Sequence, residues 1–99
     1  MLYAIVTKDV VNSAELRKAH SIEHMRRLTE LKNLGKLVIA GPLTREQSID
    51  THIAGVDGSL IVAEFESLNE AQRWLDEDPF SLAGVYESVR VNPFKKLLP

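Results

Sequence analysis

Two helical segments separate four short β-favouring segments in this chain, and that order leaves few possible topologies. The predicted strands are apolar and rich in β-branched residues, and they cover 2–8, 36–43, 59–66 and 86–91. The resulting order, β-α-β-β-α-β, is that of the split-βαβ or ferredoxin-like arrangement, in which both helices cover one face of a four-stranded sheet. We therefore expect an α+β fold built on a ferredoxin-like βαββαβ protomer.

The first helix has clear signals at both ends. Asn12 or Ser13 can cap its N-terminus, and Glu15 then lies in the first turn. No glycine or proline interrupts the following residues until Gly35, which favours a C-terminal cap. These signals predict a helix of about 20 residues that ends at Leu34.

The second helix is shorter and its end is set by a proline. It begins at Ser67 or Asn69 and continues through Leu75. It should end before Pro79, because the residue that precedes a proline is disfavoured in the α region. Pro93 is likewise expected to stop the fourth strand.

The longest polar stretch covers residues 44–58, between the second and third predicted strands. Gly41 and Pro42 close the second strand, since proline cannot donate to the ladder. No helical or strand periodicity follows them up to Gly58. The sequence predicts a loop there, and a loop of this length in a small domain is often functional.

The size and composition describe one folded domain over residues 1–99. Hydrophobic residues make up 44% of the 99 residues and charged residues 26%, as in ordinary globular proteins. The net charge of -2 does not suit a nucleic-acid partner, and no apolar run approaches the roughly 20 residues of a membrane span. We expect a cytoplasmic protein that binds neither nucleic acid nor membrane.

The sheet is expected to be apolar on both faces, although helices cover only one of them. Alternate residues of the first strand point to opposite faces, and both sets are apolar or β-favouring: Tyr3, Ile5 and Thr7 on one, Leu2, Ala4 and Val6 on the other. A monomer rarely leaves such an area in water, and without cysteine no disulfide can stabilise the domain. We expect a homodimer that pairs through the helix-free sheet face with two-fold symmetry.

Two histidines interrupt the apolar stripe of the first helix. The stripe consists of Leu16, His20, His24, Leu28, Leu31 and Leu34. Histidines at this spacing can bind a metal, but zinc needs a further ligand, and Ser21 stands where the zinc-protease motif has glutamate. Packing of both rings against the sheet is the simpler interpretation, and we expect no metal and no cofactor.

Three carboxylates mark the end of the second helix, in the segment Asp76-Glu77-Asp78-Pro79-Phe80. Negative charge at a helix C-terminus opposes the helix dipole, so it is unfavourable unless another group uses it. A solvated acidic helix end, in which Pro79 and Phe80 turn the chain and fill the core, is the simpler interpretation of the segment. An aspartate that reaches a histidine, however, can fix the tautomer of the ring for acid-base chemistry.

Several short motifs occur together in a fixed order along the chain. They are Met1-Leu2-Tyr3, Arg17, His24-Met25-Arg26-Arg27-Leu28, Ala40-Gly41-Pro42, Gly58-Ser59, Ala63-Glu64-Phe65-Glu66-Ser67-Leu68, Asp78-Pro79-Phe80, Ala83-Gly84-Val85-Tyr86-Glu87 and Val91-Asn92-Pro93-Phe94-Lys95-Lys96. With these motifs the chain resembles the YciI-like (YCII-related domain) family over almost its full length.

The resemblance implies a dimeric α/β-barrel assembly and an active site built around a histidine and an aspartate, which correspond to His24 and Asp78. His20 does not match a position of the family's motifs. Some relatives are similar to lyases that remove chloride from a chlorinated hydroxymuconolactone, and most have no assigned reaction. The resemblance therefore implies a site more definitely than a substrate.

The expected function is that of a small-molecule enzyme, a lyase or isomerase, in which His24 moves a proton and Asp78 orients it. The expected substrate contacts come from Arg17, Gly41, Pro42 and Ser59. A guanidinium can bind a carboxylate through two hydrogen bonds, and glycine lets a ligand approach the backbone. A non-catalytic ligand-binding or sensor module and a purely structural interaction domain are the alternatives.

Overall fold

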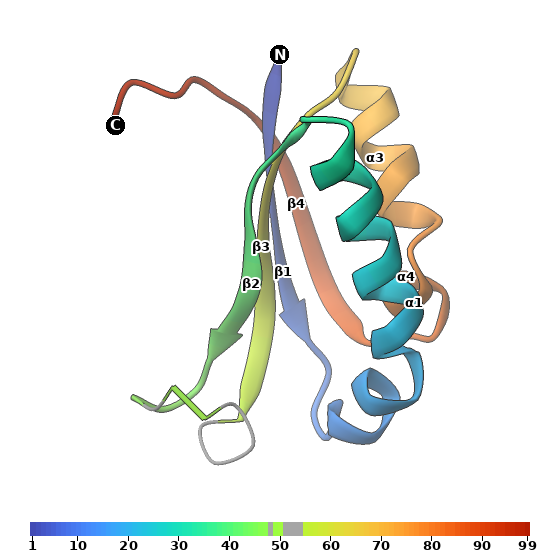
Figure 1. Cartoon of the computed structure of the whole chain (residues 1–99). Helices are drawn as coiled ribbons and strands as arrows, with labels where there is room; N and C mark the ends of the chain where they lie inside the picture. Colours follow the sequence, from blue (N-terminus) through green and yellow to red (C-terminus); the bar gives the residue numbers. More distant parts are fainter. Residues whose placement is uncertain (48, 51–54) are drawn as a thin grey trace.

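The computed structural model describes residues 1–47, 49–50 and 55–99. Within them, four strands form one antiparallel sheet in the order β2-β3-β1-β4. The strands are β1 (Leu2–Asp9), β2 (Leu37–Thr44), β3 (Val56–Glu64) and β4 (Tyr86–Phe94), and the helices of the same residues are α1 (Ala14–Asn33), α3 (Leu68–Asp76) and α4 (Pro79–Leu82). Figure 1 shows all these helices on one side of the sheet. This arrangement confirms the ferredoxin-like α+β fold.

The first helix starts where the sequence predicts, but its cap works differently. Ser13 is the N-cap residue, and its hydroxyl makes no capping hydrogen bond. It donates instead to a carboxylate oxygen of Asp9, 2.6 Å away. Asn12, the other predicted cap, lies one residue earlier with a φ of 61°. The helix ends at Asn33, and Gly35 then takes a φ of 72°, as its predicted capping role requires.

The second predicted helix is present, and a further short helix follows it. Ser67 is the N-cap of α3, where its hydroxyl accepts the backbone N–H of Glu70 at 3.1 Å, so the alternative start at Asn69 is wrong. The four residues of α4 are too few for a periodic pattern to predict. Asp78 and Pro79 were nevertheless a readable signal, because they occupy the N-cap and the first turn of α4. Asp78 thus lies at a helix N-terminus, where the dipole favours negative charge.

The strands β1, β3 and β4 are longer than predicted, while β2 keeps its predicted length and is shifted by one residue. Val56 and Gly58 already pair with β2, so the predicted loop 44–58 is wrong at its C-terminal end; residues 48 and 51–54 lie outside the described part. The third strand ends at Glu64 rather than Glu66. Neither Pro42 nor Pro93 stops its strand, because β2 and β4 are the edge strands and a missing N–H can face outward there.

The core lies between the sheet and the helices. Its buried residues are Tyr3, Ile5, Leu28, Leu31, Ile61, Ala63, Phe65, Ala71 and Leu75. Of the predicted stripe on the first helix, His24, Leu28 and Leu31 are buried. Leu34 is 67% exposed, because the helix has already ended there, and its assignment to the core-facing stripe is wrong.

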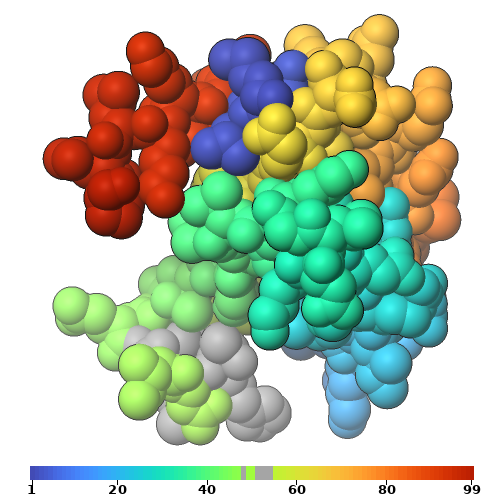
Figure 2. Space-filling view, turned by 45° about the horizontal axis from the view of Figure 1, so that its top comes forward, coloured from blue at the N-terminus to red at the C-terminus, as the bar shows by residue number. Residues whose placement is uncertain are grey.

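The other face of the sheet is not covered by any helix of the described residues. The strand registers place Leu2, Ala4, Val6, Ile39, Leu43, Leu60, Val62 and Phe94 on it. Val6 and Ile39 are 40% and 53% exposed. Residues 95–99 project away from the sheet, as both views show (Figures 1 and 2). No helix in the described part of the chain has the length and apolarity to cross a membrane.

Candidate functional site

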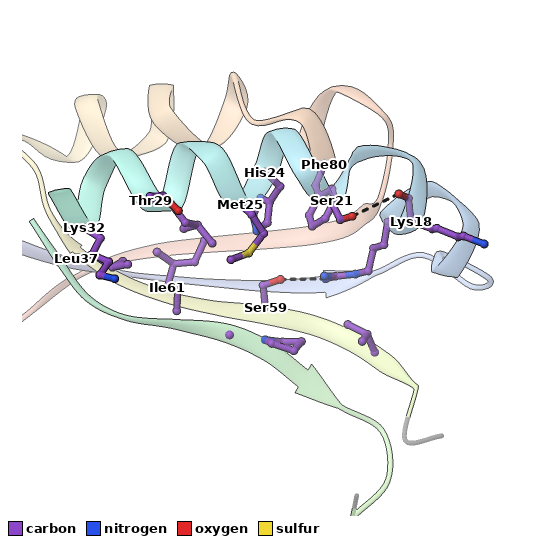
Figure 3. Close-up of a pocket in the computed structure, with 16 residues that line it drawn as sticks. Lys18, Ser21, His24, Met25, Thr29, Lys32, Leu37, Ser59, Ile61 and Phe80 are labelled. Carbon is purple, nitrogen blue, oxygen red and sulfur yellow. Dashed lines mark hydrogen bonds between the residues drawn. The ribbon is translucent and has the colours of Figure 1, made fainter. Parts of the chain in front are cut away.

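A cavity of about 630 Å³ opens between α1 and the β2–β3 side of the sheet. In Figure 3, His24, Met25 and Thr29 project from α1 toward Ser59 and Ile61 of β3. Phe80 of α4 and Leu37 of β2 complete much of the apolar wall. The charged residues that line the cavity within the described chain are all cationic: Arg17, Lys18 and Lys32. This combination favours a partly apolar ligand that carries negative charge or acidic oxygens.

His24 and Asp78 form a buried pair at this cavity. The His24 Nδ1 atom lies 2.8 Å from an Asp78 carboxylate oxygen, although the residues are 54 positions apart. Their exposed fractions are 7% and 0%. Asp78 also accepts hydrogen bonds from Arg27 Nη1 at 2.9 Å and from the backbone N–H of Phe80 at 3.0 Å.

These donors determine the charge of Asp78. Burial alone would raise the pKa of its carboxyl, but the hydrogen bond and charge of His24 oppose this effect. The hydrogen bonds from the Phe80 N–H and the Arg27 guanidinium also lower the pKa of Asp78, which lies below its ordinary value of 3.8. An ionised carboxylate can only accept, so Nδ1 of His24 carries the hydrogen. In neutral His24, the Nε2 atom is therefore free to accept a proton.

Phe80 holds the imidazole ring in place. The rings of Phe80 and His24 are stacked, with centroids 4.0 Å apart and planes inclined by 18°. Phe80 is itself positioned by α4, where its N–H binds Asp78. The short helix α4 thus fixes both the partner and the orientation of His24.

Arg17 belongs to a second buried cluster beside the first. Its Nε and Nη2 atoms bind the carboxylate of Asp9 at 2.6 and 2.8 Å. Nη2 also donates to the Ser59 hydroxyl at 2.9 Å, a contact drawn in Figure 3. The guanidinium lies 4.9 Å from the centre of the Phe80 ring. The two-bond carboxylate contact expected for a substrate is therefore made to Asp9, while Arg17 still lines the cavity.

The cavity gathers five of the six predicted site residues: Arg17, His24, Gly41, Pro42 and Ser59. Asp78 is not among the described residues that line the cavity, but it binds His24, which is. A side chain added at Gly41 would meet nothing within 4 Å, but it would point to the helix-free face, on which the paired Leu60 lies, so this open space is not part of the cavity. The roles of all six residues remain predictions.

Sequence reasoning missed Arg27, Asp9 and Phe80 as members of the site. Arg27 lies three residues after His24, so a helical projection places both on neighbouring positions of one face, and that signal was readable. Asp9 follows an apolar strand, and a lone carboxylate in that place gives no local indication of its partner. His20 is half-buried and is not among the described residues that line the cavity.

The sequence and the fold are both similar to those of known proteins. Protein YciI of Escherichia coli is 47% identical over 97 residues, which cover 98% of this chain and 99% of that protein. An uncharacterized protein of Haemophilus influenzae is 39% identical over the same coverage.

A solved structure is also similar over nearly the whole chain. It is the 5-chloro-2-hydroxyhydroquinone dehydrochlorinase of Burkholderia phenoliruptrix in complex with 2,5-dihydroxybenzoquinone. The two chains are 28% identical with a TM-score of 0.86, over 96% of this chain and 94% of the other. The family model of the YCII-related domain matches residues 1–95, so this chain belongs to the YCII-related domain family.

Proposed function

We propose that this protein is a small-molecule enzyme in which His24 takes a proton from a ligand in the cavity. The observation that carries the proposal is the buried 2.8 Å contact between His24 and Asp78 at the cavity wall. Asp78 holds the hydrogen on Nδ1, stabilises the imidazolium that forms, and leaves Nε2 as the base. The reaction class is that of a lyase, including dehydrochlorination, or of an isomerase, since both begin with removal of a proton.

The proposed ligand is a flat cyclic compound with acidic oxygens. The similar dehydrochlorinase holds 2,5-dihydroxybenzoquinone, a ring of this kind. In this chain, Phe80, Ile61 and Met25 offer apolar surface to a ring, and Lys18 and Lys32 line the cavity as further cations beside the Asp9-bound Arg17. Among the described residues no carboxylate lines the cavity, and this favours the ionised form of such a compound.

Proton transfer can be measured without knowledge of the natural substrate. The ionised enol of 2,5-dihydroxybenzoquinone can take a deuteron from D₂O at a ring carbon, which becomes an sp³ carbon next to a carbonyl. A base such as His24 then removes the original proton from this carbon, so that the ring hydrogen is exchanged for deuterium. The protein should accelerate this exchange, followed by proton NMR, and His24→Ala should slow it by about 100-fold or more.

His20→Ala is the matched control, because it removes a histidine one turn away on the same helix that does not line the cavity. It should leave the exchange rate unchanged. Binding of the quinone without accelerated exchange, and with equal affinity in the His24→Ala variant, would favour a non-catalytic binding or sensor module instead.

We also propose that two copies of the chain pair through the helix-free sheet face. The support is its apolar surface: Val6, Ile39, Leu43 and Phe94 are between 39% and 53% exposed although they lie on one continuous face. Sedimentation equilibrium should give a mass near twice 11.1 kDa at micromolar concentration. Ile39→Lys should shift the species toward the monomer, while Ile22→Lys, at an exposed position of α1, should not. A wild-type monomer would contradict this assembly.

A further inference from the structure

Arg27 is held in place by two acceptors that bind the same nitrogen atom. Its Nη1 donates to a carboxylate oxygen of Asp78 at 2.9 Å and to the backbone carbonyl oxygen of Trp74, also at 2.9 Å. This nitrogen carries two hydrogens, so the two acceptors use both of them. The guanidinium also lies 4.4 Å from the centre of the Trp74 ring, and the side chain is 14% exposed. Arg27 of α1 is therefore fixed against α3 and the start of α4.

The two oxygens of Asp78 have different partners. Oδ2 contacts His24 Nδ1 at 2.8 Å and accepts the Phe80 N–H at 3.0 Å. Oδ1 accepts the hydrogen bond from Arg27. Among the described residues, Arg27 is the one partner of Asp78 whose positive charge does not depend on protonation of His24. The side chain of Asp78 is 1% exposed, so water cannot replace Arg27 in compensating the negative charge.

The charge of Arg27 has a consequence for His24. A buried carboxylate is strongly unfavourable without a positive charge beside it. If that charge did not come from Arg27, the pair would gain it by binding a proton, and the proton would go to His24 because imidazole is more basic than a carboxylate. An imidazolium has hydrogens on both nitrogens and cannot act as a base. With Arg27 in place, the carboxylate is already compensated and His24 can stay neutral.

We propose that Arg27 is a positioning residue that supplies the positive charge for Asp78 and thereby keeps His24 available as a neutral base. Arg27 is not among the described residues that line the cavity, so it acts through Asp78 and not on a ligand. This inference rests on the proposed function and adds to it the group that sets the protonation of the base.

The other charged or titratable groups near the dyad do not replace Arg27. They are Arg17 with its partner Asp9, Lys18 and Lys32 at the cavity, the exposed Glu77 beside Asp78 in the chain, and Tyr86 at the edge of the Phe80 ring. Burial raises the pKa of Tyr86 to about 12, so its hydroxyl stays protonated. Within the described part of the chain, the side chains that bind the Asp78 carboxylate are His24 and Arg27.

The protonation of His24 can be measured in the ligand-free protein by ¹⁵N–¹H correlation NMR of the imidazole ring. In the wild-type protein near neutral pH, the ring should be neutral with its hydrogen on Nδ1. In Arg27→Gln, the pH at which the ring is half protonated should rise by about one unit, because a nearby positive charge is removed. Arg27→Lys keeps the charge and should restore most of the wild-type titration.

Two outcomes of the NMR titration would overturn the proposal. One is a wild-type ring that carries both hydrogens near neutral pH, a result that needs no variant. The other is an equal titration of His24 in the wild-type protein and in Arg27→Gln.

Arg26→Gln is the matched control for the charge. Arg26 precedes Arg27 on the same helix, is 57% exposed, and pairs at the surface with Glu23 and Glu30. Its substitution should leave the titration of His24 unchanged. A shift as large as that of Arg27→Gln would show a general effect of net charge and contradict the specific role of Arg27.

The pH dependence of quinone deuterium exchange tests the consequence for the reaction. In Arg27→Gln, the acidic limb of the rate should move to higher pH by the same unit. Exchange should therefore fall by about tenfold on the acidic side and reach at least the wild-type rate above the limb. A rate lowered equally at every pH would indicate general disorder and overturn the positioning role. If the wild-type protein does not accelerate exchange, the proposed function fails, and the NMR titration still decides the role of Arg27.

Discussion

Gly58→Ala is expected to destabilise the fold by about 3 kcal/mol or more, the upper end of what overpacking a tight interior costs. A methyl group at Gly58 would collide with the backbone carbonyl oxygen of Thr7. Both residues lie inside the ladder between β1 and β3, where Gly58 pairs with Lys8 and Thr7 with Ser59. A carbonyl in a central strand cannot rotate away without breaking hydrogen bonds of the ladder. The strain can therefore be relieved only at the cost of strand pairing.

Gly41→Ala is the matched control for this prediction. Gly41 also lies in a strand, opposite Leu60, but a methyl group there would meet no atom within 4 Å. Its unfolding free energy should change by less than about 1 kcal/mol, the ordinary size of a glycine-to-alanine effect at an unstrained position. Urea denaturation of the two variants measures the difference. Similar midpoints for both would show that β1 and β3 can separate at Thr7 without loss.

Asp78→Asn is expected to reduce quinone deuterium exchange by about 100-fold to 10,000-fold, the range of general acid-base catalysis. The wild-type carboxylate accepts the Nδ1 hydrogen of His24. The oxygen that contacts Nδ1 also accepts the Phe80 N–H, and the other oxygen accepts Arg27, so an amide cannot satisfy all three donors. The change is small in volume, and its effect on exchange comes from loss of the negative charge that stabilises the imidazolium of His24.

Asp76→Asn is the control for the dyad. Asp76 lies two residues earlier, at the end of α3, and is exposed and bound to Gln72 Nε2 at 2.9 Å. Its substitution should leave exchange unchanged. Because Asp78 also binds Arg27, each variant should be checked for a cooperative thermal transition before exchange is compared. A folded Asp78→Asn variant with the wild-type exchange rate would contradict the assigned role of the dyad.

The local signals of the sequence were sufficient for the order of the four strands and the two longer helices, but not for α4. Ser67 and Gly35 mark a helix start and a helix end through interactions within a few residues, and the apolar alternation of 2–8 is a property of one strand. The proline boundaries were misleading for a reason that no local pattern contains. Pro42 and Pro93 remain in their strands because those strands lie at the sheet edges, and edge position depends on how all four strands assemble.

The residues of the candidate site likewise divide into those that the sequence could predict and those that it could not. His24 stands out in the sequence because it interrupts an apolar stripe, and its pairing with Asp78 was expected from the family resemblance rather than from spacing. Arg27 was accessible to helical projection. Asp9 could not be predicted as a site residue, since its contact with Arg17 depends on the bend between β1 and α1.

The sequence by itself determined an α+β fold, the order of its four strands and two longer helices, and the residue types available for proton transfer, because propensities, caps and periodicity act over a few residues. Only the tertiary structure decided which of those residues meet. It places Asp78 at the start of α4 against a histidine 54 residues away, and it brings Arg27 to the other oxygen of the same carboxylate. Such contacts arise when distant elements pack against one sheet, and burial then changes the hydrogen-bonding and charge of the groups that they enclose.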